Sequence, residues 1–265
     1  MTERGPISAL VLAGSRRGES DPVARYRGAP AKCLVTAGGV PMLARVVLAL
    51  RQSPKVGRIL ISADDPTLVD RVEQLRGVAD VTVLGSAESL SASVERGFAE
   101  AGPPLLVTTA DHALLEPAMV DLFLARADAS GADVAVALVA AATIRASHPE
   151  TKRTFLRFRD GGYSGANLFL LRTPTAADGI AFWRRIERDR KAPWRLARAL
   201  GPLLLLSYLL RVATLAQAMR LVSKRLGLRT AAVVLPMAEA AIDVDKPADL
   251  DLVERILAAR GGTPA

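Results

Sequence analysis

Apolar runs that alternate with helical segments constrain the fold of this chain most. Five runs have the length and composition of buried strands, and an amphipathic stretch at Pro66–Gly77 predicts one of the helices between them. The runs are Ile7–Ala13, Val56–Ala63, Val81–Leu84, Leu105–Asp111 and Ala132–Ala140. Strands that alternate with helices of about ten to fifteen residues predict a parallel sheet with crossover helices. We therefore expect a mostly parallel, Rossmann-like α/β fold in which ligands bind beyond the carboxyl ends of the strands.

The pattern changes in the second half of the chain. Two strand-like runs flank Asp160-Gly161-Gly162, which predicts a hairpin or a reversal of the chain. The region at about 176–228 is basic and has helical spacing, and a last strand and a last helix follow it at Ala231–Pro236 and Pro247–Arg260. We expect a single domain over residues 1–265 that contains a basic helical insertion.

A polar, cation-rich loop follows the first strand. Gly14 ends the apolar run, Arg16 and Arg17 come next, and Lys32 precedes the next helical segment. Glycine lets the backbone approach phosphate oxygens, while N–H and guanidinium groups neutralise their charge. The composition therefore suits a polyphosphate site, with an ordinary βα connection carrying solvated arginines as the alternative. The spacing after Gly14 fits neither the Rossmann fingerprint nor the P-loop.

The same stretch resembles the signature of the molybdenum-cofactor-guanylyltransferase-like NTP transferases, which are nucleotidyltransferases of glycosyltransferase-A-type fold. That signature reads roughly L-A-[GA]-G, an arginine, and then P-K-x-L…G-x-P-M-L. The chain departs from it at Ser15, which replaces the second glycine, and at Ala31, which separates Pro30 from Lys32. The nucleotide-binding residues that the resemblance implies are Leu12, Ala13, Gly14 and Ser15. The catalytic residues that it implies are Lys32, Arg16 and Arg17.

Two carboxylates are expected to hold a metal ion. Asp111 closes an apolar strand at the sheet edge where the phosphate loop begins, and a carboxylate there can bind Mg²⁺ together with nucleotide phosphates. The segment AIDVDKPADL resembles the family's closing D-I-D-T-P-E-D-L segment, whose third position supplies the second metal ligand. This resemblance implies Asp245, with Asp243 as the alternative, and Mg²⁺ as the cofactor. A helix-capping role is the structural alternative for Asp111 and for Asp245.

Two further segments resemble substrate-binding parts of the family. Ser89–Phe98 resembles the S-V-x-x-G-L segment that lines the base pocket of cytidylyltransferases, which favours CTP slightly over the other NTPs. GGYSGANLFLL resembles the segment that contacts the acceptor, and two basic residues precede it. The expected nucleotide contacts are Ser91 and Ser93, and the expected acceptor contacts are Lys152, Arg153, Tyr163 and Asn167. A solvated strand edge explains the basic pair equally well.

The charge and the cysteine content limit the partners and the compartment. The formal net charge of +8 suits an anionic partner, and the single cysteine, Cys33, argues against a disulfide framework. The short apolar run near the N-terminus ends in arginines and is no signal peptide, so we expect a cytoplasmic protein. Nucleic acid is disfavoured as a partner, because the chain has no recognisable nucleic-acid-binding module.

The basic segment Trp183–Leu221 has three interpretations. A lid or a dimer contact is one, which leaves a homodimer open. An amphipathic surface against anionic lipid, with Trp183 and Trp194 at the headgroup level, is another and would place the protein at the inner face of the membrane. A transmembrane helix is disfavoured, because Arg211 lies inside the Leu-rich stretch.

The sequence thus predicts a Mg²⁺-dependent nucleotidyltransferase of cytidylyl- or guanylyl-transferring type. It would transfer NMP from an NTP to a phosphorylated acceptor and release pyrophosphate. The acceptor would be a phospho-alcohol, a phospho-sugar or a lipid head-group precursor. One alternative is a nucleotide-sugar-dependent glycosyltransferase, which usually has D-x-D where this chain reads Asp111-His112-Ala113. The other is a non-catalytic, membrane-associated nucleotide-binding protein.

Overall fold

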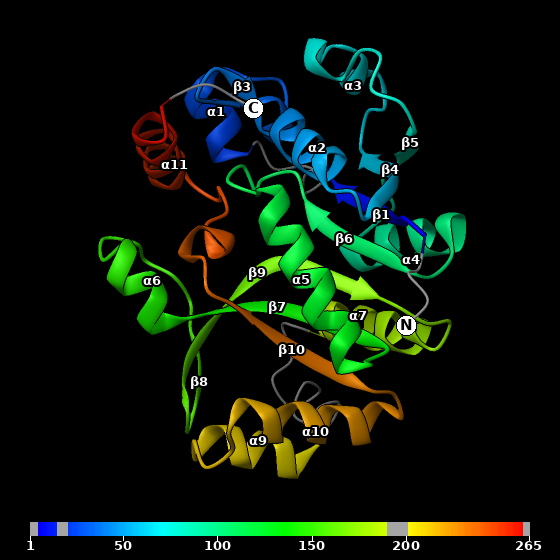
Figure 1. Ribbon diagram of the computed structural model, residues 1–265, viewed down its shortest axis with the longest axis vertical. Coiled ribbons are helices and arrows are strands. Elements are labelled where there is room, and N and C mark those ends of the chain that lie inside the picture. Colours follow the sequence, from blue (N-terminus) through cyan, green and yellow to red (C-terminus); the bar gives the residue numbers. More distant parts are fainter. Residues whose placement is uncertain (1–4, 15–20, 190–200, 262–265) are drawn as a thin grey trace.

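One mixed sheet forms the centre of the molecule. The computed structural model describes residues 5–14, 21–189 and 201–261. Within these ranges, eight strands form the sheet in the order β10-β7-β9-β6-β1-β4-β5, with β8 paired to β9 (Figure 1). The strands are β1 Ile7–Leu12, β4 Val56–Ala63, β5 Val81–Gly85, β6 Leu105–Thr109, β7 Val134–Ala140, β8 Leu156–Phe158, β9 Gly161–Leu171 and β10 Thr230–Leu235. A separate ribbon joins β2 Thr36–Ala37 and β3 Val40–Pro41.

The pairing confirms the mostly parallel α/β fold. Strands β1, β4, β5 and β6 run parallel, as do β7 and β10. Strand β9 is antiparallel to β6, β7 and β8, so the predicted hairpin exists and its second strand enters the sheet. The α-helices are α1 Pro22–Arg27, α2 Met42–Gln52, α3 Thr67–Asp70, α4 Leu90–Ala101, α5 Pro117–Ser130, α6 Ala141–Ser147, α7 Ala176–Asp189, α9 Pro202–Leu209, α10 Leu215–Leu226 and α11 Pro247–Ala259. Short 3₁₀-helices are η1 Lys32–Leu34, η2 Glu73–Leu75 and η3 Ala238–Ala241.

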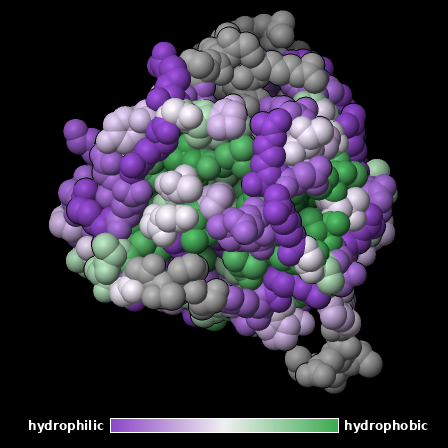
Figure 2. All heavy atoms as spheres, turned by 90° about the horizontal axis from the view of Figure 1, so that it is seen from above, coloured by the Kyte–Doolittle hydropathy of each residue, from purple (hydrophilic) through white to green (hydrophobic). Residues whose placement is uncertain are grey.

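Helices cover both faces of the sheet. Helices α2 and α5 pack on one face in the largest core cluster, which includes the fully buried Leu43, Leu50 and Phe123. Helices α4 and α7 pack on the other face through Val94 and Ile180. Burial of aliphatic side chains on both faces explains why the strands read as continuous apolar runs. Seen from the end of the molecule that carries α2 and α3, hydrophilic side chains surround apolar residues near the centre (Figure 2).

Local structure differs from the prediction at Pro66–Gly77. The structure has the short helix α3 and the 3₁₀-helix η2 there instead of one amphipathic helix. The buried residues Val69, Val72 and Leu75 recur every three positions, which suits three-residue turns better than a continuous α-helix. Backbone bonds from Val72 N to Val69 O and from Leu75 N to Val72 O follow that three-residue pattern.

The helical insertion is attached firmly to the sheet at its start. The ring of Trp183 on α7 stacks on Phe169 of β9, with centroids 6.0 Å apart and planes at 26°. Trp183 therefore packs against the sheet, which differs from its expected position at a lipid headgroup. Trp194 lies outside the described residues. Within the described ranges, no helix is both long enough and apolar enough to span a bilayer.

Candidate functional site

The site begins where β1 and β6 end side by side. Leu12 pairs with Thr109 at the carboxyl ends of these parallel strands, and Asp111 follows two residues later. Thr109 Oγ1 donates a hydrogen bond to Asp111 Oδ1 at 2.5 Å, which fixes the carboxylate. The backbone N of Val244 donates to the carbonyl O of Asp111 at 3.1 Å. This bond brings Asp245 beside Asp111, although they are far apart in the sequence.

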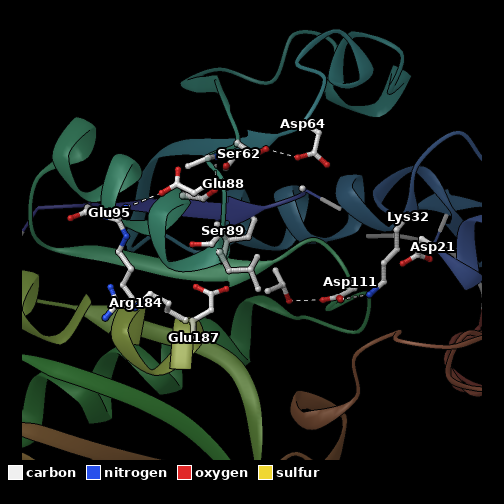
Figure 3. Close-up of a pocket in the computed structure, with 18 of the residues that line it drawn as sticks. Asp21, Lys32, Ser62, Asp64, Glu88, Ser89, Glu95, Asp111, Arg184 and Glu187 are labelled. Carbon is white, nitrogen blue, oxygen red and sulfur yellow. Dashed lines mark hydrogen bonds and ion pairs between the residues drawn. The ribbon is translucent and has the colours of Figure 1, made fainter. Parts of the chain in front are cut away.

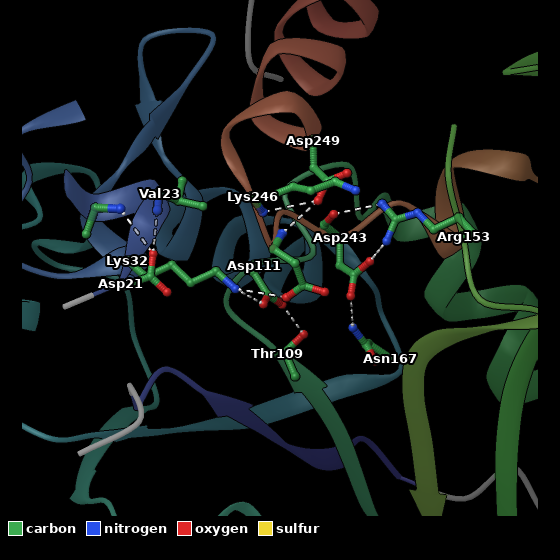
Figure 4. Close-up of polar contacts among 12 residues, drawn as sticks. Asp21, Val23, Lys32, Thr109, Asp111, Arg153, Asn167, Asp243, Lys246 and Asp249 are labelled. Carbon is green, nitrogen blue, oxygen red and sulfur yellow. Dashed lines mark hydrogen bonds and ion pairs between the residues drawn. The ribbon is translucent and has the colours of Figure 1, made fainter. Parts of the chain in front are cut away.

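Lys32 lies between the two carboxylates. Its Nζ is 2.6 Å from Asp111 Oδ2 (Figure 4) and 3.3 Å from Asp245 Oδ1. The short helix η1 holds the lysine there, because the neighbouring Cys33 is buried in the core. Burial lowers the pKa of Lys32, but the two carboxylates raise it more, so its pKa lies above the ordinary value. Lys32 is therefore a fixed positive charge at neutral pH.

Asp249 fixes the backbone at Asp245 through hydrogen bonds. Its Oδ2 accepts hydrogen bonds from the backbone N of Asp245 and of Lys246, both at 3.1 Å, in the first turn of α11. The side chain of Asp245 itself is 66% exposed, against 17% for Asp111. Asp245 is thus anchored through its main chain while its carboxylate remains open to a ligand.

Asp243 faces a different set of partners. Arg153 pairs with its carboxylate and also donates to its carbonyl O at 2.8 Å, and Asn167 Nδ2 donates to Oδ2 at 3.1 Å (Figure 4). Burial raises the pKa of Asp243, although Arg153 opposes this shift. Because its oxygens are used in these bonds, the structure favours Asp245 over Asp243 as the second carboxylate next to Lys32.

The predicted acceptor-binding residues lie apart from the main cleft. Arg153 and Asn167 contact Asp243, and Asn167 has a left-handed φ of 46°. Tyr163 packs its ring near Phe158, and Lys152 is exposed. Their roles toward an acceptor stay predictions.

A cleft of about 1580 Å³ runs from Lys32 to α7 (Figure 3). Its lining residues include Leu12, Gly14, Lys32, Ser62, Asp64, Ser86, Ser89, Ser93, Asp111, Asp245, Arg184, Arg185, Glu187 and Arg188. A Cβ at Gly14 would lie 3.0 Å from Asp64 Oδ1 and 3.3 Å from Ser86 Cβ, so a side chain here would crowd both neighbours. Ser15, Arg16 and Arg17 lie outside the described residues, and Ala13 does not line the cleft.

The serine segment opens helix α4 on the wall of this cleft. Ser89 is the N-cap of the helix, and Ser93 Oγ accepts from Ala87 N at 2.9 Å. Ser91 is fully buried and donates both its backbone N–H, at 3.1 Å, and its hydroxyl to Glu187 of α7. Burial raises the pKa of Glu187, but the hydrogen bonds from the serine segment outweigh it, so the pKa lies below the ordinary value. The predicted nucleotide contact Ser91 therefore already has a partner.

Helix α7 supplies cleft residues that were not among the predicted site residues. Arg184 donates to Glu95 Oε2 at 2.6 Å and to Glu88 Oε1 at 2.8 Å, which ties α7 to α4. The side chains that line the cleft from α7 are Ala181, Arg184, Arg185, Glu187 and Arg188. Residues at positions i, i+3, i+4 and i+7 share one helix face, so the spacing of Ala181 and the three arginines was a usable signal.

The carboxylates suit a magnesium ion that is bound together with nucleotide. No group of three or more potential metal-ligating side chains occurs in the part of the chain that the structure describes. Mg²⁺ is usually bound through one or two carboxylates plus substrate phosphates and water, without a complete protein cage. Asp111 and Asp245 provide this donor set, since both already face the same cation, the ammonium of Lys32.

Comparison with known proteins places the chain among nucleotidyltransferases. A 2-C-methyl-D-erythritol 4-phosphate cytidylyltransferase of Rhodococcus opacus is 31% identical over 189 residues, which is 67% of this chain and 79% of that protein. The enzyme of the same name from Frankia casuarinae is 37% identical over 119 residues, which is 44% of this chain. That match spans 42% of the length of the Frankia protein.

Solved structures show the same fold over nearly the whole chain. A hypothetical transferase from Thermus thermophilus has a TM-score of 0.79 and 30% identity, and the alignment covers 92% of this chain and 99% of that one. A CMP:2-keto-3-deoxy-manno-octonic acid synthetase complexed with CTP has a TM-score of 0.58, 17% identity and coverage of 96% and 99%. The family model of the MobA-like NTP transferase domain matches residues 9–229, so this chain belongs to that family.

Proposed function

We propose that this protein is a Mg²⁺-dependent cytidylyltransferase that transfers CMP from CTP to a phosphorylated small molecule. The observation that carries the proposal is the position of Lys32 between Asp111 and Asp245, at the strand ends and inside the cleft that Gly14 lines. Two carboxylates next to a lysine suit Mg²⁺ that is bound together with the phosphates of a nucleotide. The membership in the NTP transferase family supports the same reading.

The reaction is a substitution at the α-phosphorus of the nucleotide. An oxygen of the acceptor phosphate forms a bond to this phosphorus, the bond to the bridging oxygen of the β-phosphate breaks, and pyrophosphate leaves. Phosphoryl transfer depends on positioning and charge stabilisation, so Lys32 would stabilise negative charge on the α-phosphate. Arg16 and Arg17 would do the same for the leaving pyrophosphate. Mg²⁺ held by Asp111 and Asp245 would neutralise phosphate charge and align the phosphates.

The nucleotide would lie along the wall formed by β1 and α4. Leu12, Gly14 and Ser93 line the cleft there. The other proposed nucleotide contacts are Ala13, Ser15 and Ser91. CTP is favoured because the relatives with a named activity are cytidylyltransferases, and because a related fold was solved with CTP.

The acceptor would be a phosphorylated alcohol or sugar. Both of the relatives from Frankia and Rhodococcus are named for a phosphorylated sugar alcohol, 2-C-methyl-D-erythritol 4-phosphate. In this chain, Arg185 and Arg188 line the end of the cleft opposite Lys32, where Arg184 is already paired with Glu88 and Glu95. These arginines provide a second point of attraction for an anionic acceptor, while Lys152, Arg153, Tyr163 and Asn167 remain proposed contacts.

Pyrophosphate release tests the proposal. The purified protein is incubated with Mg²⁺, each of the four NTPs and a panel of phospho-alcohols and phospho-sugars, with Asp111→Asn as the inactive control. We expect pyrophosphate from CTP only when an acceptor phosphate is present. Absence of pyrophosphate with every pair, together with release of a nucleoside diphosphate from a nucleotide sugar, would replace the proposal with a glycosyltransferase.

A further inference from the structure

The positive charge of the protein is concentrated in the helical insertion. Residues 176–228 contain eleven Lys and Arg against three Asp and Glu, a formal charge of +8. The whole chain also carries +8, so the remainder of the sequence has equal numbers of basic and acidic residues. Arg184, Arg185 and Arg188 of α7 belong to the cleft, but residues 201–228 still contain four Lys and Arg and no Asp or Glu. Such a distribution favours a negatively charged partner for the part of the insertion that holds α9 and α10.

Exposed apolar side chains gather in the same insertion, at the end of α9. Leu206, Leu209, Leu210 and Val212 are 55%, 65%, 63% and 54% exposed. These four make up more than half of the large apolar side chains that are exposed within the described ranges, and they fall within seven consecutive positions. An apolar cluster of this kind marks an interaction site more often than isolated exposed residues do.

Unpaired basic residues surround this apolar cluster. Arg211 lies within it, with a left-handed φ of 53° that ends the turn after α9, and Arg220 and Lys224 lie on α10. All three are exposed, and none has a carboxylate partner among the residues that the structure describes. Arg220 and Lys224 also border a groove of about 470 Å³ beside Val212 and Leu221. Figure 1 shows α9 and α10 together at one end of the molecule, far from α3.

We propose that the α9–α10 face docks on an anionic lipid bilayer surface. The leucines of the α9 end would enter the interfacial region, and Arg211, Arg220 and Lys224 would meet the headgroups. The favoured occupant is a bilayer and not a second copy of the chain, because two copies would bring two strongly positive insertions together. Trp183 takes no part, since it packs on Phe169 of the sheet.

Vesicle sedimentation of the full chain tests this docking, independently of the proposed reaction because no nucleotide is added. The protein is mixed with vesicles of neutral phosphatidylcholine, or of phosphatidylcholine with about a third phosphatidylglycerol, at low and high salt. We expect binding to the anionic vesicles only, and loss of that binding at high salt because salt screens the charges. Equal recovery in the supernatant with both vesicle types at low salt would overturn the proposal.

Matched variants show whether lipid binding depends on the α9–α10 face or only on the total charge of the protein. Arg220→Gln/Lys224→Gln should weaken the partition onto anionic vesicles roughly tenfold or more, from the contribution of each basic residue near an anionic leaflet. Arg71→Gln/Arg76→Gln removes the same charge from exposed positions near α3 and η2, and should leave partition nearly unchanged. Equal losses in the two double variants would overturn the proposal.

The apolar cluster has its own variant. Leu209→Gln/Leu210→Gln should also weaken the partition several-fold and should keep the wild-type melting temperature, because both side chains are largely exposed. Analytical ultracentrifugation of the same proteins tests the alternative, in which a second copy of the chain binds this face. A dimer that this double variant abolishes, with no binding to anionic vesicles by the wild type, would overturn the proposal in favour of self-association.

Discussion

The two ends of the cleft are built in different ways. At one end, Lys32 on η1 and Asp111 just after β6 are about four-fifths buried and are held by backbone hydrogen bonds. At the other end, Arg184 of α7 reaches Glu88 and Glu95 through ion pairs whose side chains are about half exposed. Buried, backbone-supported charges keep their geometry, whereas exposed ion pairs typically contribute less than about 1 kcal/mol.

If the proposed function holds, this difference would separate the chemical step from substrate binding. The end with Lys32 and Asp111, which we call the rigid end, would hold charges in place where the α-phosphate reacts. Electrostatic catalysis requires such fixed charges. The α7 end, with its half-exposed ion pairs, is expected to be the more adjustable end, and its side chains would contact the substrate. Substitutions at the rigid end should therefore change kcat, and substitutions on α7 should change KM.

The largest effect is expected from Asp111→Asn. The substitution removes one negative charge from the carboxylate pair that faces Lys32, and losses of this kind commonly cost a hundredfold or more in rate. The measurement is pyrophosphate release as a function of Mg²⁺ concentration. Asp128→Asn on α5, an exposed position whose side chain has no hydrogen bond or ion pair within the part of the chain that the structure describes, is the matched control and should keep full activity. Near-normal turnover of Asp111→Asn would remove this residue from the proposed metal site.

Lys32→Ala should lower kcat about tenfold or more and change the KM for CTP much less. The ammonium is most useful when charge develops in the transition state, so its loss affects the chemical step first. Lys55→Ala, in the turn before β4, serves as the control for loss of a lysine. A raised KM with unchanged kcat would show that Lys32 only holds the substrate.

Arg153→Met tests whether the pair of Arg153 with Asp243, next to the rigid end, stabilises the folded protein. Arg153 is 9% exposed and pairs with Asp243, so its removal leaves a mostly buried carboxylate without its cation. We expect a loss of about 1–3 kcal/mol in the free energy of unfolding without any substrate present. Arg157→Met, an exposed position on β8, should have little effect. An unchanged unfolding free energy with a raised KM for the acceptor would instead support the predicted contact with acceptor phosphate.

The strand ends explain how much of this site the sequence could reveal. The predicted run Val56–Ala63 matches β4 residue for residue, and the carboxyl ends of β1 and β6 meet as parallel strands require. The convergence of Lys32, Asp111 and Asp245 follows from this edge and from the resemblance to the family. Their catalytic and metal-binding roles stay predictions.

Helix α1 has a sequence signal that is easy to miss, whereas other features of the structure depend on tertiary contacts. Helix α1 begins with Asp21, whose side chain accepts from Val23 N at 2.9 Å, and ends at Gly28 in the left-handed region. These are ordinary capping residues, hidden in a stretch dominated by polar side chains. By contrast, the pairing of Arg153 with Asp243 depends on how β9 enters the sheet, and Glu187 meets Ser91 only because α7 packs on α4. No local pattern specifies those contacts.

The smallest effect is expected from Glu187→Ala, which acts on the adjustable end. Glu187 uses the N–H and hydroxyl of Ser91 and adds a negative charge to a cleft that would bind a polyanion. Its removal frees Ser91 for the nucleotide, so the KM for CTP should fall about two- to fivefold, within the range of a partly exposed charge. Asp178→Ala removes a carboxylate from the same helix at an exposed position outside the cleft, and should leave KM unchanged. Steady-state kinetics at several CTP concentrations gives the KM for CTP of both variants. A rise in KM for Glu187→Ala would mean that the carboxylate holds α4 in its binding position, and the two ends of the cleft would then be equally rigid.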